Sequence, residues 1–149
     1  MAEHNDLGKL GEELAVEFLE KNGYSILETN WTFQKAEVDI IAKKEGILAV
    51  VEVKTRSSID FGLPQDFVKP KKIQLLVKAI NEYVISNDLD VEVRFDIIAL
   101  HKDGKGFKME HLEDAFYHFL CCICNKLFFI AIFAASLKHK KNENCFLNC

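Results

Sequence analysis

The chain has 149 residues, 49% hydrophobic and 28% charged, so it is long enough for one domain with a buried core and too short for two ordinary domains. Residues 1–120 carry 15 basic and 22 acidic side chains, a net charge of about −7, which excludes a uniformly basic nucleic-acid-binding protein. Any nucleic-acid surface must then be a local basic patch or be bridged by metal ions. The polar start, Met1–Asp6, has no apolar run of a secretory signal, and we therefore expect a cytoplasmic protein.

Residues 6–22 are predicted to form the first helix, with Asp6 as N-cap and Gly23 as the left-handed residue that ends it. Apolar residues at three- and four-residue spacing predict its core stripe: Leu7, Leu10, Leu14 and Phe18. Glu12 lies away from the charged face, among small or apolar neighbours that permit close approach to another element. Glu12 is either part of a site or a favourable negative charge near the helix start.

Three β-strands are predicted next, over residues 24–33, 36–44 and 47–55, each rich in Ile, Val, Trp, Phe or Thr. The connections between them are very short, which indicates an antiparallel meander. The third strand is almost continuously apolar, so we expect it to be central and covered on both faces.

A long loop over residues 56–69 is predicted to lead into a helix over 70–87, which Pro70 opens. A strand over 91–100 follows, and the β-α-β order predicts that it runs parallel to strand 47–55 with a right-handed crossover. A turn and a short segment, 107–112, come after it. The apolar stripe of the helix is predicted to be Ile73, Leu76, Val77, Ile80 and Val84. A neighbouring face of the helix carries Lys71, Gln74 and Lys78, close to Lys69, and is either solvated or in contact with phosphates.

Charged residues interrupt the strands at Asp39, Glu52 and Lys54. Glu52 and Lys54 are two apart and therefore point to one face of their strand, while Asp39 lies on the neighbouring strand within cross-strand reach. Two carboxylates that close repel each other unless a proton or a cation intervenes. Oxygen ligands suit Mg²⁺ or Mn²⁺, and the backbone carbonyl of Val53 is a further candidate ligand. The alternative is an internal salt-bridge cluster, although burial makes such clusters weak contributors to stability.

These residues resemble the PD-(D/E)xK signature of restriction-endonuclease-like nucleases. An ordered set of motifs within residues 4–119 resembles, more narrowly, the YraN-like family of predicted endonucleases, which is distantly similar to archaeal Holliday-junction resolvases. The motifs are Gly8-Lys-Leu-Gly-Glu-Glu-Leu-Ala15, Gly23-Tyr24, Asn30-Trp31, Glu37-Val-Asp-Ile-Ile41, Val51-Glu-Val-Lys-Thr-Arg56 and Arg94-Phe-Asp96. The resemblance implies an α/β, restriction-endonuclease-like fold: a mixed central sheet flanked by helices.

The same resemblance implies that Asp39 and Glu52 are metal ligands and Lys54 the catalytic lysine, with Glu12 as the acidic residue that resolvase-like enzymes add from the first helix. Arg56 and Gln74 are implied candidates for positioning phosphate or water. One departure is Ala36, where family members usually have glycine; alanine costs about 1 kcal/mol if that position needs a positive φ.

The last residues, 120–149, have a different character and hold all five cysteines. Their uninterrupted apolar run, Leu127–Ala135, is far shorter than the roughly 20 residues that span a bilayer, so we expect no stable membrane association. A zinc site from Cys121, Cys122, Cys124 and His139 matches no standard spacing. An added helix, an association segment or a non-native coding end remain alternatives.

The sequence therefore predicts a nuclease-like domain over residues 1–119 and a tail over 120–149. The expected function is Mg²⁺- or Mn²⁺-dependent hydrolysis of DNA phosphodiester bonds, with branched or recombination intermediates as candidate substrates. A resolvase-like role would imply a homodimer. The alternative is a catalytically silent module that keeps the fold and binds nucleic acid or another partner.

Overall fold

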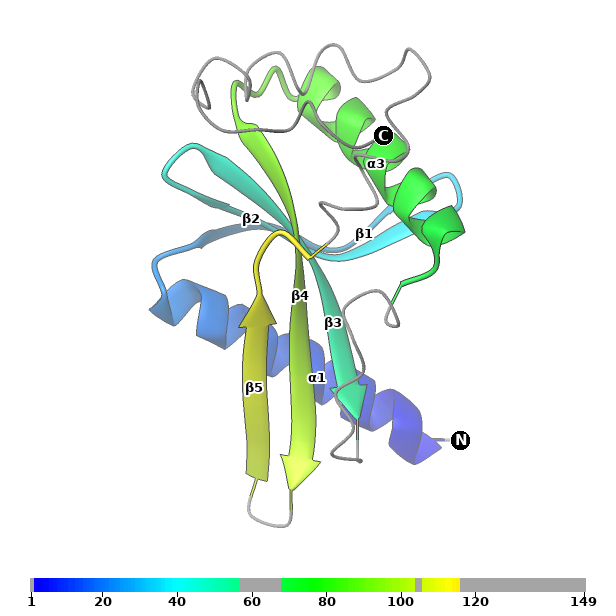
Figure 1. Cartoon of the computed structure of the whole chain (residues 1–149), viewed down its shortest axis with the longest axis vertical. Coiled ribbons are helices and arrows are strands. Elements are labelled where there is room, and N and C mark those ends of the chain that lie inside the picture. The colour runs from blue at the N-terminus through cyan, green and yellow to red at the C-terminus, as the bar shows by residue number, and fades with distance from the viewer. Residues whose placement is uncertain (1, 57–67, 104–105, 116–149) are drawn as a thin grey trace, which may run out of the picture.

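The computed structural model describes residues 2–56, 68–103 and 106–115, which form one sheet and two helices (Figure 1). The elements in chain order are α1 (Ala2–Lys21), β1 (Ser25–Phe33), β2 (Ala36–Lys44), β3 (Ile47–Arg56), α3 (Pro70–Ser86), β4 (Glu92–Asp103) and β5 (Gly106–Leu112).

The sheet has the order β1-β2-β3-β4-β5. Strands β1, β2 and β3 are consecutive antiparallel neighbours, β3 and β4 pair in parallel, and β4 and β5 are antiparallel. This confirms the predicted meander, crossover helix and parallel fourth strand, and with them the mixed α/β architecture.

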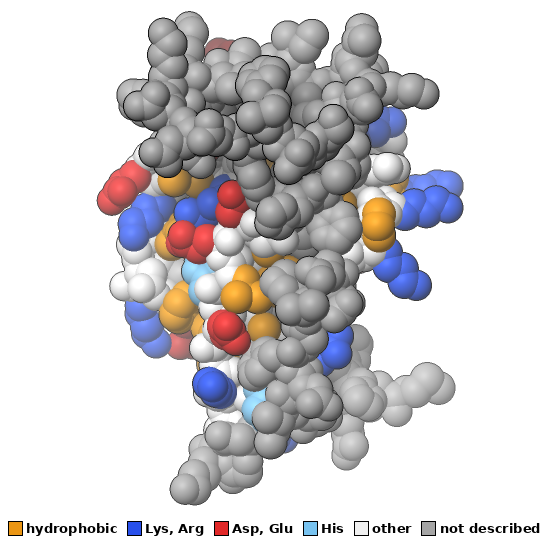
Figure 2. All heavy atoms as spheres, in the orientation of Figure 1, with side chains coloured by type: hydrophobic (Ala, Val, Ile, Leu, Met, Phe, Trp, Pro, Cys, Tyr) orange, Lys and Arg blue, Asp and Glu red, His pale blue; other side chains and the backbone are white. Residues whose placement is uncertain are grey.

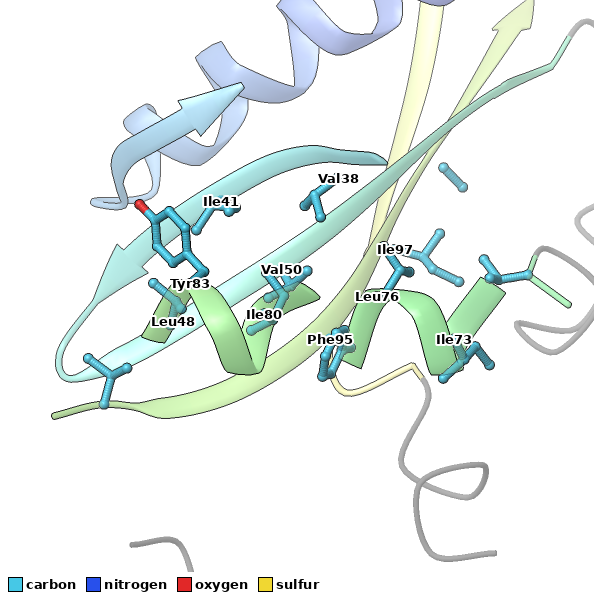
Figure 3. Close-up of a cluster of buried hydrophobic side chains, with 13 residues drawn as sticks. Val38, Ile41, Leu48, Val50, Ile73, Leu76, Ile80, Tyr83, Phe95 and Ile97 are labelled. Atoms are coloured by element: carbon cyan, nitrogen blue, oxygen red, sulfur yellow. The ribbon is translucent and has the colours of Figure 1, made fainter. Parts of the chain in front are cut away.

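The two helices cover opposite faces of the sheet. Helix α1 crosses behind strands β3, β4 and β5 in Figure 1 and packs Ala15 and Leu19 against one face. Helix α3 packs against the other face, where its side chains meet Val50, Phe95 and Ile97 of the strands (Figure 3). Strand β3 is buried from Leu48 to Val53 because a layer covers it on each side, as its apolar sequence predicts.

The predicted core stripe of the first helix is partly wrong. The buried line is Gly11, Ala15 and Leu19, whereas Leu10 is 42% exposed. The small residues Gly11 and Ala15 determine which face is buried, because they allow the helix axis to approach β3 more closely than a line of leucines would.

The helix also begins at Ala2 and not after Asp6, since residues 2–5 contain no Gly or Pro that would prevent a helix. Gly23 has φ +84° and is the predicted left-handed residue after α1.

Helix α3 agrees better with its predicted stripe. Ile73, Leu76 and Ile80 are buried as expected, with Ala79 and Tyr83 beside them, while Val77 and Val84 lie at the edge of the core. Lys69 precedes Pro70 in extended conformation, as a residue before proline should.

Three predictions fall on residues outside the described ranges: most of the loop 56–69, the end of the domain at residue 119, and the tail 120–149 with its cysteines. Within the described ranges, neither helix has the length and apolar character that crossing a bilayer requires.

Candidate active site

Asp39 lies where β2 and β3 separate. The pairing of these strands runs from Lys44–Ile47 to Ile40–Val51 and stops there, although β2 remains paired with β1 beyond this point. The Asp39 Oδ2 atom accepts a hydrogen bond of 2.7 Å from the backbone N–H of Val53. The carboxylate thus takes the place of a strand carbonyl and is held against β3.

Glu52 and Lys54 lie on one face of β3, as the two-residue spacing predicts. Glu52 is 3% exposed, and the Lys54 ammonium, 29% exposed, contacts its Oε1 atom. A buried ionised carboxylate needs such a partner, because desolvation otherwise favours the neutral form.

A second lysine, which the sequence analysis missed, completes this cluster. Lys72 of α3 contacts the same Oε1 atom of Glu52 and is 40% exposed. A signal for it exists in the sequence: Lys72 precedes Leu76 by four positions and Ala79 by seven, which places it on the buried line of the helix. The ammonium group of a lysine on a core-facing line must reach either a buried anion or solvent.

The two carboxylates influence each other. Burial and, after it, the negative charge of Glu52 raise the pKa of Asp39 to about 6, although the Val53 N–H, Lys54 and Lys72 act in the opposite direction. The Asp39 carboxylate therefore lies in a place where an additional cation would be favourable.

Glu12 of α1 borders a cavity that Asp39 also borders. A cavity of about 320 Å³ lies between α1 and the strands β1 and β2, and both Glu12 and Asp39 line it. The Glu12 Oε2 atom accepts a hydrogen bond of 3.1 Å from the side chain of Asn30. Asn30 has φ +51° and lies opposite Asp39, between the pairs Thr29–Ile40 and Trp31–Val38. The structure thus places Glu12, Asn30 and Asp39 around one cavity.

The residues predicted to contact phosphates lie outside the Glu52 cluster. Lys71, Gln74 and Lys78 are exposed on α3, Lys69 is exposed directly before it, and Arg56 is exposed at the end of β3. Lys78 donates a 3.4 Å hydrogen bond to Gln34. In Figure 2, basic side chains project from the side of the molecule where α3 lies in Figure 1. Their role in phosphate contact stays a prediction.

A separate polar cluster surrounds Asp96 of β4, which is fully buried. Arg94 donates to both carboxylate oxygens, at 2.8 to 3.2 Å, and the His111 ring nitrogen and the Asp114 N–H each lie 3.0 Å from the carboxylate. Burial alone would raise the pKa of Asp96, but the hydrogen bonds from His111, Arg94 and Asp114 hold it below its usual range. These partners satisfy the carboxylate, so the cluster is a structural connection between β4 and β5.

The comparisons with known proteins agree with the motifs. The sequence model described as "Uncharacterised protein family UPF0102" matches residues 11–100. The chain belongs to this family, the YraN-like group.

Relatives in the UPF0102 family cover most of the chain. The chain is 82% identical to a UPF0102 protein of Flavobacterium psychrophilum over 119 residues, which is 80% of this chain and all of that protein. It is 68% identical over 123 residues to the one of Flavobacterium johnsoniae, again 80% of this chain and all of the relative. A UPF0102 protein of Bacteroides fragilis is 50% identical over 117 residues, which is 78% of this chain and 97% of that protein. The UPF0102 match, residues 11–100, includes Glu12, Asp39, Glu52, Lys54 and Lys72.

The donor set of this UPF0102 chain fits one kind of metal. In the part of the chain that the structure describes, no three His, Cys, Asp or Glu side chains converge closely enough to enclose an ion. Mg²⁺ does not need such an enclosure, because it is commonly held by one or two carboxylates and keeps several waters. Asp39 and Glu52 would supply these two carboxylates. Burial and, after it, the charge of Glu52 raise the pKa of Asp39, and a cation would relieve the repulsion between the two groups.

Proposed function

We propose that the chain is a metal-dependent endonuclease that hydrolyses phosphodiester bonds of DNA in the cytoplasm, with branched or recombination intermediates as its substrates. The observation that carries the proposal is that Asp39 is hydrogen-bonded to the Val53 N–H, between Glu52 and Lys54, at the point where β2 leaves β3, and that the charges of Glu52 and Lys54 both act on its carboxylate. Two buried carboxylates beside a lysine contribute little to the stability of the fold, because the cost of desolvation offsets much of their attraction. The same three groups suit the metal-assisted hydrolysis of a phosphate ester.

Asp39 and Glu52 would hold Mg²⁺ or Mn²⁺, with the Val53 carbonyl as a candidate third ligand. When bound, the ion supplies charge for the phosphate and acidifies a water. The Val53 N–H fixes the orientation of Asp39 before any ligand arrives. Lys54 would orient the attacking water or stabilise charge that develops on the phosphate. Glu12, which borders the same cavity as Asp39, would accept a hydrogen bond from a water there.

DNA would reach the site along α3. Lys69, Lys71, Gln74 and Lys78 would contact backbone phosphates, with Arg56 at the end of β3. Because the protein is acidic overall, these contacts make a local patch, and a divalent ion between carboxylates and phosphate would add to the affinity. Two strands of a symmetric junction would need two sites, so a homodimer is the expected assembly.

One observation favours a second candidate, a nucleic-acid-binding module without turnover. Lys54 and Lys72 both contact Glu52, so its charge is already compensated by the protein itself. A chain that had lost metal binding would keep such an ion-paired cluster.

The test is cleavage of branched and linear DNA by the full-length protein with Mg²⁺ or Mn²⁺. We expect cleavage that chelation abolishes and that Asp39→Ala or Lys54→Met lowers at least about 100-fold. Glu20→Gln is the control, since Glu20 is exposed on α1 and does not line the cavity that Glu12 and Asp39 border. DNA binding without cleavage would favour the second candidate, and cleavage that survives both substitutions would contradict the proposed site.

A further inference from the structure

Two lysines share one oxygen of a buried glutamate. Both ammonium groups contact Glu52 Oε1, and Glu52 is 3% exposed. One cation would balance the single negative charge of this carboxylate. The second cation occupies a position beside the carboxylate pair Asp39 and Glu52, where it also favours the ionised form of Asp39.

The two lysines differ in how they are held. Lys54 belongs to β3 itself, two residues from Glu52, so the pleat of the central strand fixes its direction. Lys72 comes from the first turn of α3, a separate element, and its side chain is more exposed than that of Lys54, 40% against 29%. Lys72 can therefore turn away from Glu52 into solvent without any change in the sheet.

The charges around Glu52 predict which lysine leaves. The ionised carboxylates of Asp39 and Glu52 balance the ammonium groups of Lys54 and Lys72. A divalent cation on these carboxylates would make the cluster positive by two charges, and it would repel the nearest ammonium groups. Departure of the more exposed lysine lowers this repulsion.

From this arrangement we propose that Lys72 is an exchangeable counter-ion of the site. It pairs with Glu52 in the metal-free protein, yields its place to the divalent cation, and then contacts a phosphate of the DNA. Lys69 and Lys71, exposed at the same end of α3, lie where the freed side chain would meet the DNA backbone. The inference rests on the proposed function for its ligands, but its central statement, competition between Lys72 and a cation for Glu52, can be measured without DNA cleavage.

The first experiment is calorimetric titration of the full-length protein with Mn²⁺, without DNA. Lys72→Met removes the competing ammonium, so we expect it to bind Mn²⁺ about fivefold more tightly than wild type. Lys72→Arg restores a competing charge and should bind like wild type. Lys71→Met is the matched control, because it removes a charge from the same turn but from the exposed side. If Lys72 were only a structural connection between α3 and β3, Lys72→Met would lower the melting temperature and leave the Mn²⁺ affinity unchanged.

The second experiment measures the salt dependence of DNA binding. With Ca²⁺ present, Lys72→Met should reduce the slope of log K against log salt by about one, the loss of one phosphate contact. With chelator, wild type and variant should have equal slopes, because Lys72 then stays on Glu52.

The outcomes separate the two proposals. Tighter Mn²⁺ binding by Lys72→Met without any DNA cleavage would support the exchange and contradict the endonuclease. Cleavage by wild type with unchanged Mn²⁺ affinity in Lys72→Met would overturn the exchange alone. If neither protein binds Mn²⁺, both proposals fail.

Discussion

Gly11 of α1 and Thr55 of β3 meet where the helix crosses the strand. A Cβ atom built at Gly11 would lie 1.9 Å from Thr55 Oγ1, well inside any contact distance. The Thr55 hydroxyl is buried there and has no hydrogen-bond partner in the described part of the chain. Glycine at position 11 therefore sets how closely α1 approaches β3, and with it how Glu12 reaches the cavity beside Asp39.

Gly11→Ala should lower the free energy of unfolding by about 2 kcal/mol, because the added methyl group forces α1 away from β3. Urea denaturation would measure this. Gly8→Ala on the same helix is the control: nothing lies within 4 Å of its Cβ, so alanine should stabilise the helix by up to about 1 kcal/mol. If Gly11→Ala left the free energy of unfolding unchanged, α1 and β3 would be less closely packed than the structure indicates. In that case, adding Thr55→Ala to Gly11→Ala should not raise the free energy of unfolding either.

Asp39→Asn should make the protein more stable at neutral pH. The pKa of Asp39 is raised to about 6 by burial and by Glu52, so the folded state prefers the protonated carboxyl. The contribution of Asp39 to the free energy of unfolding is therefore fully present below about pH 4 and is lost as the pH rises through 6. The difference is up to about 3 kcal/mol. Asparagine stays neutral and still accepts the hydrogen bond from Val53. We therefore expect higher stability than wild type at pH 8, a smaller difference at pH 4, and loss of cleavage. Wild-type stability that rises between pH 4 and pH 6 relative to the variant would contradict this.

Asp96→Asn should have the opposite effect on stability. The pKa of Asp96 is held below its usual range, so its contribution is present above about pH 4 and is lost as the pH falls further. The substitution leaves Arg94, which is mostly buried, without its anion, and should cost about 3 kcal/mol at pH 7. Denaturation at pH 7 and pH 3 should show the gap between wild type and variant narrowing at the lower pH. Equal stability at pH 7 would mean that Glu113 alone satisfies Arg94.

Asn30 should act on the site through Glu12. Asn30→Gly keeps the left-handed backbone at φ +51° but removes the hydrogen bond to Glu12, whereas Asn30→Ala removes the bond and also strains the backbone. Both variants should lose cleavage to a similar extent, about tenfold, as should Glu12→Gln. Only Asn30→Ala should be less stable, by about 1 kcal/mol. Full activity in Asn30→Gly would show that Glu12 needs no support from β1.

The sequence by itself determined the order and type of the elements and the pairing of Glu52 with Lys54. Strand and helix periods are local properties, so apolar runs separated by short breaks predict the meander, and a spacing of two places both charges on one face of β3. The parallel β4 followed from the handedness of a β-α-β unit. Asp39 was placed correctly beside Glu52 because a meander brings consecutive strands together.

Only the tertiary structure decided that Lys72 of α3 contacts Glu52. Lys72 contacts Glu52 because of the position at which α3 packs on β3, and no local sequence pattern specifies that position. The same reason explains α1, where its predicted leucine stripe was partly displaced by Gly11, Ala15 and Leu19. Contact between elements depends on how closely their backbones approach, and a single pair, Gly11 and Thr55, sets that approach here.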